Sequence, residues 1–190
     1  QALDRVLAAD VISPISVPAH DNSAMDGFAF HGADLLPDAA TTLTIVGTVF
    51  AGKAFDGTVR HGQCVRIMTG AVMPAVCDTV VPQEFTHSAS DTTVAVPQGV
   101  VRTGDNRRQM GEDLQEGKPA LTQGRILRPA DLGLLASLGI SQVMVQRRLR
   151  VAFFSTGDEL RSLGDELDPG CIYDSNRYTL FGMLTRLGCE

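Results

Sequence analysis

The chain has 190 residues, 44% of them hydrophobic and 20% charged, which is the composition of an ordinary soluble globular protein. Its 16 lysines and arginines against 22 acidic residues give a net charge of −6, which excludes the broad positive surface that nucleic acids require. No apolar run is long enough to cross a bilayer, and the first residues do not resemble a signal peptide. We therefore expect a cytoplasmic protein with neither a nucleic-acid nor a membrane partner.

The first residues predict a short helix followed by a strand. Leu3, Val6 and Leu7 have the spacing of one helical face, which predicts the end of a helix before Ala9. Residues 10–13 have the composition of a strand, and two prolines interrupt the segment that follows. The chain begins with Gln and ends soon after a helical pattern without a further strand, so we expect a fragment of a longer protein.

Residues 27–96 show short alternating apolar segments separated by glycine, proline and Ser-Asp turns. No helical periodicity of useful length interrupts them. The pattern predicts a small, mostly antiparallel β domain. Its expected strands are residues 27–30, 43–50, 64–68, 79–82 and 92–96.

The composition changes after residue 99, where a polar loop extends to residue 113. A strand is expected at residues 126–127, and Pro129 then opens a predicted helix that Gly139 ends. Further strands are expected at residues 143–145 and 151–154. The charged run between these two strands is interpreted as a solvated linker and a domain boundary.

The last 40 residues have the pattern of one strand-loop-helix unit of a parallel sheet. The apolar strand at residues 151–154 is predicted to be buried on both faces, and Ser175 is predicted to cap a helix that Gly188 ends. One such unit lacks a neighbouring parallel strand. We therefore expect either that the sheet continues past residue 190 or that a partner chain completes it.

The four cysteines are far apart in the sequence and never form a Cys-x-x-Cys pair. Neither a zinc site nor a disulfide framework is therefore indicated, and we expect reduced thiols that pack in the interior. His61 precedes Cys64 by three residues, which is the nearest approach to a pair of metal ligands. No second pair accompanies it, so we interpret this spacing as chance.

Residues 21–29, DNSAMDGFA, place two carboxylates, an amide and a hydroxyl where a turn is predicted to enter a strand. Side chains at such a junction are held by a rigid element and remain accessible to a ligand, which makes Asp26 a candidate site residue. The same spacing is also typical of an Asx turn that closes on its own backbone and leaves Asp26 solvated.

Three other segments place polar groups where ligands often bind. Thr69 and Gly70 follow a predicted strand and offer a hydroxyl and backbone donors, although a simple hairpin exit has the same pattern. Arginines and carboxylates share the loop at residues 104–113, where surface ion pairing is the alternative interpretation. Residues 155–159 lie beyond the carboxyl end of a predicted parallel strand, where open α/β sheets bind ligands.

The acidic residues of these segments would suit a hard cation such as Mg²⁺, which can bridge a phosphate or another oxyanion to an acidic protein. They are Asp26, Asp113, Asp158 and Glu159. No Ser-His-Asp set, P-loop or dinucleotide-binding motif occurs. Electrostatic positioning of anions by metal and arginine is the chemistry that remains.

The motifs taken together resemble those of the molybdopterin molybdenumtransferases, the MoeA family, whose relatives include the E domain of gephyrin. The matching segments occur in the family's order over nearly the whole chain. They are DNSAMDGFA at residues 21–29, RIMTGA at 66–71, Arg108 with GED at 111–113, ASLG at 136–139, FSTGDEL at 154–160, and Tyr173-Asp174 with Asn176-Arg177.

The resemblance implies a multi-domain α+β protein. A mostly antiparallel β domain at residues 20–113 would be inserted in a small mixed α/β domain formed by residues 1–19 and 114–146. Residues 147–190 would then begin a parallel-sheet α/β domain of the molybdopterin-binding type. An elongated homodimer is also implied, with its site between the β domain of one subunit and the α/β domain of the other.

The activity implied by the resemblance is insertion of molybdate into the dithiolene of adenylylated molybdopterin, with Mg²⁺-dependent release of AMP. The implied catalytic residues are Asp26, Thr69, Asp113 and Glu159. Asp113 and Glu159 would hold the cation or order a water, Thr69 would donate to an oxyanion, and Asp26 would contact either the pterin amino groups or the metal. The implied substrate-binding residues are Asn22, Ser23, Arg66, Gly70, Arg108, Glu112, Gly157 and Asp158.

Two departures from the family pattern affect these expectations. Gln109 and Met110 stand where the family often has further arginines, and the later glycine-rich and Pro-Gly-Asn-Pro segments are absent. We expect this piece to carry about half a site and to be inactive alone. The implied partners are a second copy of the chain and the molybdopterin adenylyltransferase. The alternatives are a non-catalytic scaffold on the same fold and an anion-binding β domain joined to an unrelated α/β domain.

Overall fold

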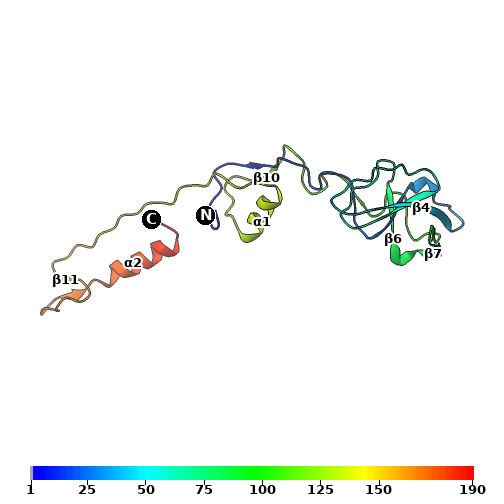
Figure 1. Ribbon diagram of the computed structural model, residues 1–190. Helices are drawn as coiled ribbons and strands as arrows, with labels where there is room; N and C mark the ends of the chain where they lie inside the picture. Colours follow the sequence, from blue (N-terminus) through cyan, green and yellow to red (C-terminus); the bar gives the residue numbers. More distant parts are fainter. Residues whose placement is uncertain (1) are drawn as a thin grey trace.

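A computed structural model describes residues 2–190 as an elongated molecule (Figure 1). A six-stranded sheet forms one end of it, α1 (Pro129–Ser137) and β10 (Pro119–Leu121) lie in the middle, and α2 (Ser175–Arg186) lies at the other end. The structure is mixed α and β, with few helices, as expected. The division into three domains stays a prediction. Within residues 2–190, no helix has the length and apolar character that a membrane span requires.

The six-stranded sheet has the order β6-β3-β5-β4-β8-β7. Its neighbouring strands pair antiparallel except β4 with β5, which run parallel. The strands are β3 (Gly27–Phe30), β4 (Thr41–Val49), β5 (Gln63–Ile67), β6 (Thr79–Pro82), β7 (His87–Ser90) and β8 (Thr93–Val96). The five predicted strands are confirmed to within two residues at each end, whereas β7 and the short 3-10 helices η1 (Gly32–Asp34) and η2 (Gln83–Phe85) were not predicted.

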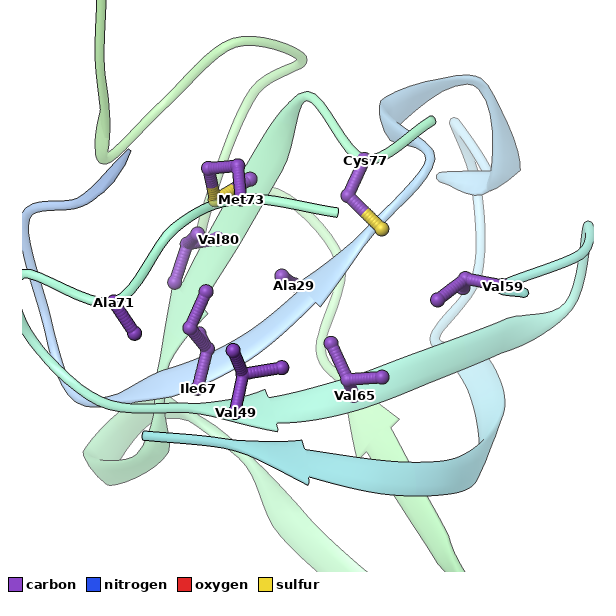
Figure 2. Close-up of a cluster of buried hydrophobic side chains, with 9 residues drawn as sticks. All are labelled: Ala29, Val49, Val59, Val65, Ile67, Ala71, Met73, Cys77 and Val80. Carbon is purple, nitrogen blue, oxygen red and sulfur yellow. The ribbon is translucent and has the colours of Figure 1, made fainter. Parts of the chain in front are cut away.

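Strand β3 is buried on both faces because it lies between β6 and β5 and separates two apolar clusters. Ala29 faces the cluster in Figure 2, which includes Val65, Ile67 and Val80. Phe30 faces the opposite cluster. Alternation along a strand sends successive side chains to opposite faces. The segment that follows Asp26 is therefore held by packing on both of its faces.

The cysteines at residues 64 and 77 belong to these two clusters and are free thiols, in agreement with the expected packing role. Burial in apolar surroundings raises the pKa of each thiol to about 12. Thiolates are the reactive form of cysteine, so neither residue is a nucleophile at neutral pH.

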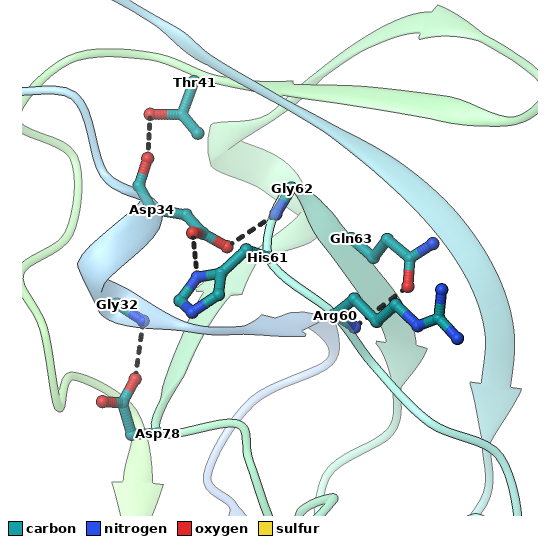
Figure 3. Close-up of polar contacts among 8 residues, drawn as sticks. All are labelled: Gly32, Asp34, Thr41, Arg60, His61, Gly62, Gln63 and Asp78. Carbon is teal, nitrogen blue, oxygen red and sulfur yellow. Dashed lines mark hydrogen bonds and ion pairs between the residues drawn. The ribbon is translucent and has the colours of Figure 1, made fainter.

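Polar contacts fix the turn after β3 against the turn before β5 (Figure 3). The Asp34 carboxylate accepts a hydrogen bond from the backbone of Gly62 at 2.9 Å and contacts Nδ1 of His61 at 2.7 Å. His61 thus faces Asp34, while Cys64 is buried in the core. The interpretation of their spacing as chance agrees with this arrangement.

The predicted helix before residue 9 is wrong. The chain instead crosses the small central core in an extended form, with isolated bridges from Val6 to Ile126 and from Leu7 to Val145. Asp4 has a φ of +60°, which no α-helix accommodates. Three apolar residues at helical spacing were too few to exclude an extended segment. The predicted strands at residues 126–127 and 143–145 likewise contain only these single bridges.

Two chain segments connect the six-stranded sheet to the small central core. β1 (Val11–Ile12) pairs antiparallel with β10, and the contact continues through the bond from the Ser13 amide to the Lys118 carbonyl at 2.8 Å. Val17 donates to the Leu114 carbonyl at 2.7 Å further along. The entry to the sheet region and the exit from it therefore lie side by side.

Helix α1 begins at Pro129 as predicted, and Gly139 follows its end with a φ of +71°. The buried Asp131 carboxylate accepts from the Arg128 amide at 2.8 Å and from Nε of Arg125 at 2.9 Å. This carboxylate fixes the start of the helix, and Leu135 then packs against Leu7 and the other residues of the central core.

The predicted buried strand at residues 151–154 is wrong for this chain, since no strand is assigned there within the described residues and Phe154 is 87% exposed. Two backbone bonds nevertheless join the segment to Glu190. The Val151 amide donates to the Glu190 carbonyl at 2.8 Å, and the Glu190 amide donates to the Leu149 carbonyl at 2.9 Å. This pair of bonds is the pattern of a parallel bridge. The segment is exposed because only one residue pairs with it.

The predicted final helix corresponds to α2, although its cap is Asp174 and not Ser175. The Asp174 carboxylate accepts from the Arg177 amide at 3.1 Å. Before it, β11 (Leu160–Arg161) and β12 (Ile172–Tyr173) form a small parallel pair that was not predicted. Phe181 of α2 remains 62% exposed. The helix therefore presents apolar surface to solvent.

Candidate functional site

Three of the motif segments meet at one edge of the sheet region. β2 (Asn22–Ser23) pairs antiparallel with β9 (Arg107–Arg108), with Asn22 opposite Arg108. On the other side of β2, the Ser23 amide donates to the Ala71 carbonyl at 3.0 Å and the Gly70 amide donates to the Ser23 carbonyl at 2.8 Å. Gly70 has a φ of +78°, which lets the chain turn after β5 without strain. The segments around residues 22, 70 and 108 are thus neighbours.

The carboxylate of Asp26 is held by Thr69. Its Oδ1 accepts from the Thr69 amide at 2.6 Å and from the Thr69 hydroxyl at 2.7 Å, and both side chains are exposed. Oδ2 receives no hydrogen bond within residues 2–190. The local turn that we considered as the alternative is instead made by Ser23, whose hydroxyl donates to the Met25 carbonyl at 2.6 Å. Asp26 therefore faces solvent with one free oxygen.

The pKa of Asp26 is lowered chiefly by the hydrogen bond from the Thr69 amide, then by that from the Thr69 hydroxyl, with a smaller contribution from the charge of Arg66. Arg66 lies on β5, is exposed, and donates to Gln83 at 3.3 Å. Asp26 is consequently a carboxylate at neutral pH and an acceptor, not a proton donor.

The loop after β9 carries the second acidic group. Nη2 of Arg108 donates to Oδ2 of Asp113 at 2.6 Å, and its Nε lies 3.7 Å from Oε1 of Glu112. These contacts raise the pKa of Arg108, with the Asp113 hydrogen bond as the largest cause. Within this chain the geometry is therefore the surface ion pairing that we gave as the alternative for this loop. It leaves one fixed guanidinium flanked by two carboxylates.

Asp21 was missed as a site residue by the sequence reasoning. Its Oδ2 accepts from Nε of Arg107 at 2.9 Å and also from Nη2, and its Oδ1 accepts from the Met110 amide at 2.7 Å. The only signal in the sequence is an acidic residue next to a very short strand. That signal has meaning only when β2 is known to pair with β9.

The remaining predicted site residues, Gly157, Asp158 and Glu159, directly precede β11 at the opposite end of the molecule (Figure 1). Gly157 has a φ of +155°, and a Cβ at this position would stand 2.7 Å from both carboxylate oxygens of Glu159. A side chain at Gly157 would therefore displace Glu159. The motif segments around Asp26 and around Glu159 are not brought together by one chain.

Two cavities are relevant to the choice of site. One of about 360 Å³ lies beside the Glu159 segment, and its polar lining residues include Arg161, Asp174 and Arg177. Another of about 500 Å³ lies between α1 and residues 140–145, and no motif-derived site residue lines it. Arg5 is the one charged side chain in the lining of this second cavity, which therefore lacks the converging charged groups that we expect around an anionic ligand.

Comparison with known families decides what these motifs belong to. The family model described as MoeA N-terminal region (domain I and II) matches residues 1–139. The chain belongs to the MoeA family. This is the family that the motifs were expected to indicate.

Relatives in the MoeA family extend the match to the whole chain. A molybdopterin molybdenumtransferase of Haemophilus influenzae is 44% identical over 190 residues, covering 100% of this chain and 46% of the relative. A molybdopterin molybdenumtransferase 2 of Mycobacterium tuberculosis is 41% identical over 183 residues, covering 95% of this chain and 45% of the relative. The chain therefore spans about half the length of these relatives.

The crystal structure of a molybdopterin biosynthesis MoeA protein from Pyrococcus horikosii has the same fold. It superimposes with a TM-score of 0.85 at 31% identity and covers 100% of this chain and 49% of that protein. The mixed fold described above is therefore a MoeA fold.

The carboxylates predicted as magnesium ligands are not gathered at one point within the described residues of a single copy. No group of three or more His, Cys, Asp or Glu side chains is placed to hold a metal ion in the described part of the chain. Asp113 is engaged by Arg108, and Glu159 lies at the other end of the molecule. The carboxylates predicted as ligands thus do not fit a common ion within one copy.

Two carboxylates of this surface, Asp21 and Asp26, have lowered pKa values and predict a pH dependence. The amides of Met110 and Thr69 are the largest causes for Asp21 and Asp26 respectively. Because each pKa is lower in the folded state, their stabilisation is present above the ordinary value of 3.8 and is lost as the pH falls through the folded value. We expect the Tm advantage of the native protein over the variant Asp21→Asn/Asp26→Asn to shrink below about pH 5 in thermal melts.

The exposed turn residue Asp38 supplies the control for this measurement. Asp38→Asn is expected to leave the pH dependence of Tm as in the native protein. A Tm difference between the native protein and the double variant that stayed constant from pH 7 to pH 3 would contradict the role of these two carboxylates.

Proposed function

We propose that this chain is the N-terminal part of a molybdenumtransferase of molybdenum cofactor biosynthesis. The proposed reaction inserts molybdate into the dithiolene of adenylylated molybdopterin and releases AMP in the presence of Mg²⁺. The observation that carries the proposal is the convergence of three family motifs on one exposed surface, where Thr69, Asp26 and the Arg108–Asp113 pair are neighbours through β2. The names of the relatives support the substrate class.

The chemistry of this surface suits an anionic substrate that also has amino groups. Arg108 presents a planar guanidinium, which binds oxyanions through parallel hydrogen bonds. Asp26 keeps Oδ2 available as an acceptor, and the amino groups of a pterin are matching donors. In the proposal, Asp26 orients the pterin end and Arg108 the oxyanion end. The ion pair between Arg108 and Asp113 would open when the substrate binds, so that Arg108 pairs with the oxyanion instead.

A second copy of the chain is part of the proposal. Glu159 and Asp113 are both exposed in a single chain, but Asp113 lies where the sheet region joins the central core, whereas Glu159 directly precedes β11 at the far end of the molecule. In an elongated homodimer, the Glu159 segment of one subunit would face the Asp113 loop of the other, and the two carboxylates together would supply the oxygen ligands that Mg²⁺ prefers. The proposal is also compatible with a contact to the molybdopterin adenylyltransferase, which would pass the adenylylated molybdopterin directly to this protein.

The test uses the whole protein that contains this chain. We expect Asp113→Ala to lower molybdate-dependent AMP release by about a hundredfold or more, because it removes both the partner of Arg108 and a proposed ligand. Glu116→Ala, an exposed acid three residues further on, should retain full activity. Removal of divalent cations with EDTA should stop the native enzyme, and added Mg²⁺ should restore it.

Binding and chemistry are separated by titrating the whole protein with adenylylated molybdopterin in a calorimeter. Saturable binding together with AMP release supports the enzyme. Absence of any binding would instead favour the alternative of a non-catalytic scaffold on the same fold. Full AMP release by Asp113→Ala would remove this residue from the proposed site.

A further inference from the structure

We propose that Asp21 is a positioning residue that orders the loop at residues 107–113, so that Arg108 and Asp113 face the substrate surface. The proposal rests on the function proposed above, because it assigns Asp21 a part in that same site. It adds a residue that does not contact the substrate but determines how two residues that do are held.

The geometry joins Asp21 to two points of the loop. One carboxylate oxygen accepts from the Arg107 guanidinium through Nε and Nη2, and the other accepts from the Met110 amide at 2.7 Å. Both oxygens are therefore occupied. The Asp21 and Arg107 side chains are each only 32% exposed, so solvent screens this pair less than a fully exposed one.

The backbone of Asp21 is also fixed. Its carbonyl accepts from the Met73 amide at 2.9 Å, next to the turn that carries Thr69 and Gly70. Further along the loop, Gly111 donates to the Pro18 carbonyl at 3.0 Å and the Asp113 amide donates to the Val17 carbonyl at 2.9 Å. Asp21 thus holds the middle of the loop through its side chain and the segment at Met73 through its backbone carbonyl.

The charges explain why this link matters. Arg107 and Arg108 are adjacent, and two acidic residues, Glu112 and Asp113, follow in the same loop. Asp21 engages Arg107, which leaves the two loop carboxylates to Arg108. Without Asp21, the Arg107 guanidinium and the Met110 amide would both lose their acceptor, and the loop that follows Arg108 would lose this anchor. The position of the Arg108 guanidinium would then no longer be unique.

A purely structural role makes a different prediction. An ordinary surface ion pair would change global stability slightly and would lower activity only in proportion to the folded fraction. A positioning role changes the loop and the turnover number while the protein remains folded. Catalysis is sensitive to displacements of about 1 Å, which can lower the rate about a hundredfold.

The experiment compares Asp21→Ala, Asp21→Asn and Asp10→Ala in the whole protein. Asp10 is the matched control, because its carboxylate also accepts a backbone amide, that of Gln123 at 2.7 Å, in the central part of the molecule. Amide hydrogen exchange is measured for peptides covering residues 107–113 without substrate. The values of kcat and KM for AMP release are measured in parallel, and the folded fraction is checked by circular dichroism.

We expect Asp21→Ala to accelerate exchange in residues 107–113 by about tenfold or more. We also expect it to lower kcat roughly tenfold to a hundredfold in fully folded protein. Asp21→Asn should give exchange and kcat values between those of the native protein and Asp21→Ala. Its amide oxygen still accepts from Met110 but no longer pairs with the charge of Arg107. Asp10→Ala should match the native protein in both measurements.

The two kinds of failure are distinguishable. Unchanged exchange in Asp21→Ala would overturn the proposal whatever the kinetics, since exchange needs no substrate. Faster exchange with unchanged kcat would also overturn it, because the loop would then be held for stability alone. A native protein without AMP release would refute the proposed function and with it the role of Asp21 in that reaction, while the exchange data would still report whether Asp21 orders the loop.

Discussion

Gly27→Ala is expected to destabilise the six-stranded sheet by about 3 kcal/mol or more. A Cβ on Gly27 would lie 2.0 Å from the carbonyl oxygen and 2.8 Å from the carbonyl carbon of Val81. Both atoms belong to the backbone of β6, which is hydrogen-bonded to β3 and cannot move away without loss of this pairing. β3 is buried on both faces and pairs with β5 on its other side, so it has little room to shift away from β6.

Urea denaturation of the whole protein, followed by circular dichroism, measures this effect. Gly133→Ala, inside α1, is the matched control, because its added Cβ meets no atom within 4 Å apart from its chain neighbours and the backbone of its own helix. In a helix this change is expected to stabilise by about 0.5–1 kcal/mol. If Gly27→Ala unfolded at the same urea concentration as Gly133→Ala, the close approach of β3 and β6 described here would be wrong.

Asp26→Ala is expected to lower kcat for AMP release by about a hundredfold to a thousandfold while the protein stays folded. Asp26 is exposed, so its removal leaves no buried cavity. It does remove the acceptor that holds the amide and hydroxyl of Thr69. The change would therefore free Thr69 and delete the carboxylate proposed to orient the pterin.

Asp26→Asn separates these two effects, because the asparagine oxygen can still accept from Thr69 but carries no charge. We expect a loss of kcat intermediate between the native protein and Asp26→Ala. Asp56→Ala, an exposed acid in the same region, supplies the control and should remain fully active. Native turnover by Asp26→Ala, with an unchanged melting curve, would place Asp26 outside the site.

The sheet was predictable because its strands alternate and are separated by glycine and proline. The predicted strand at residues 27–30 coincides with β3, because a short apolar segment directly after a turn has few other possible boundaries. β2 and β9 were not predictable, because each has two residues and no periodicity. The strand at residues 151–154 was placed by its apolar run, yet a run of this kind forms a strand only when neighbours pair with it.

The site was predictable only in part, and for a related reason. The family motifs predicted Asp26, Thr69, Arg108 and Asp113 as site residues, and this assignment stays a prediction. Their proximity depends on the register of Asn22 opposite Arg108, which no local pattern encodes. Asp21 was quoted within a motif and given no role, because its two partners lie 86 and 89 residues away. Local residue spacing does not predict contacts between residues so far apart in the sequence.

The hydrogen-bonded segments at residues 13–17 and 114–118 form a double-stranded connection between the sheet region and the central core. A single connecting segment would allow the sheet region to rotate freely. Two segments that are hydrogen-bonded to each other oppose rotation and allow mainly bending perpendicular to the plane of the pair. Asp26 and Asp113 both belong to the sheet region, where β2 pairs with β9, so bending of this connection would move them together. The sheet region would therefore approach or leave a facing surface without a change in the side-chain hydrogen bonds of Asp26 and Asp113.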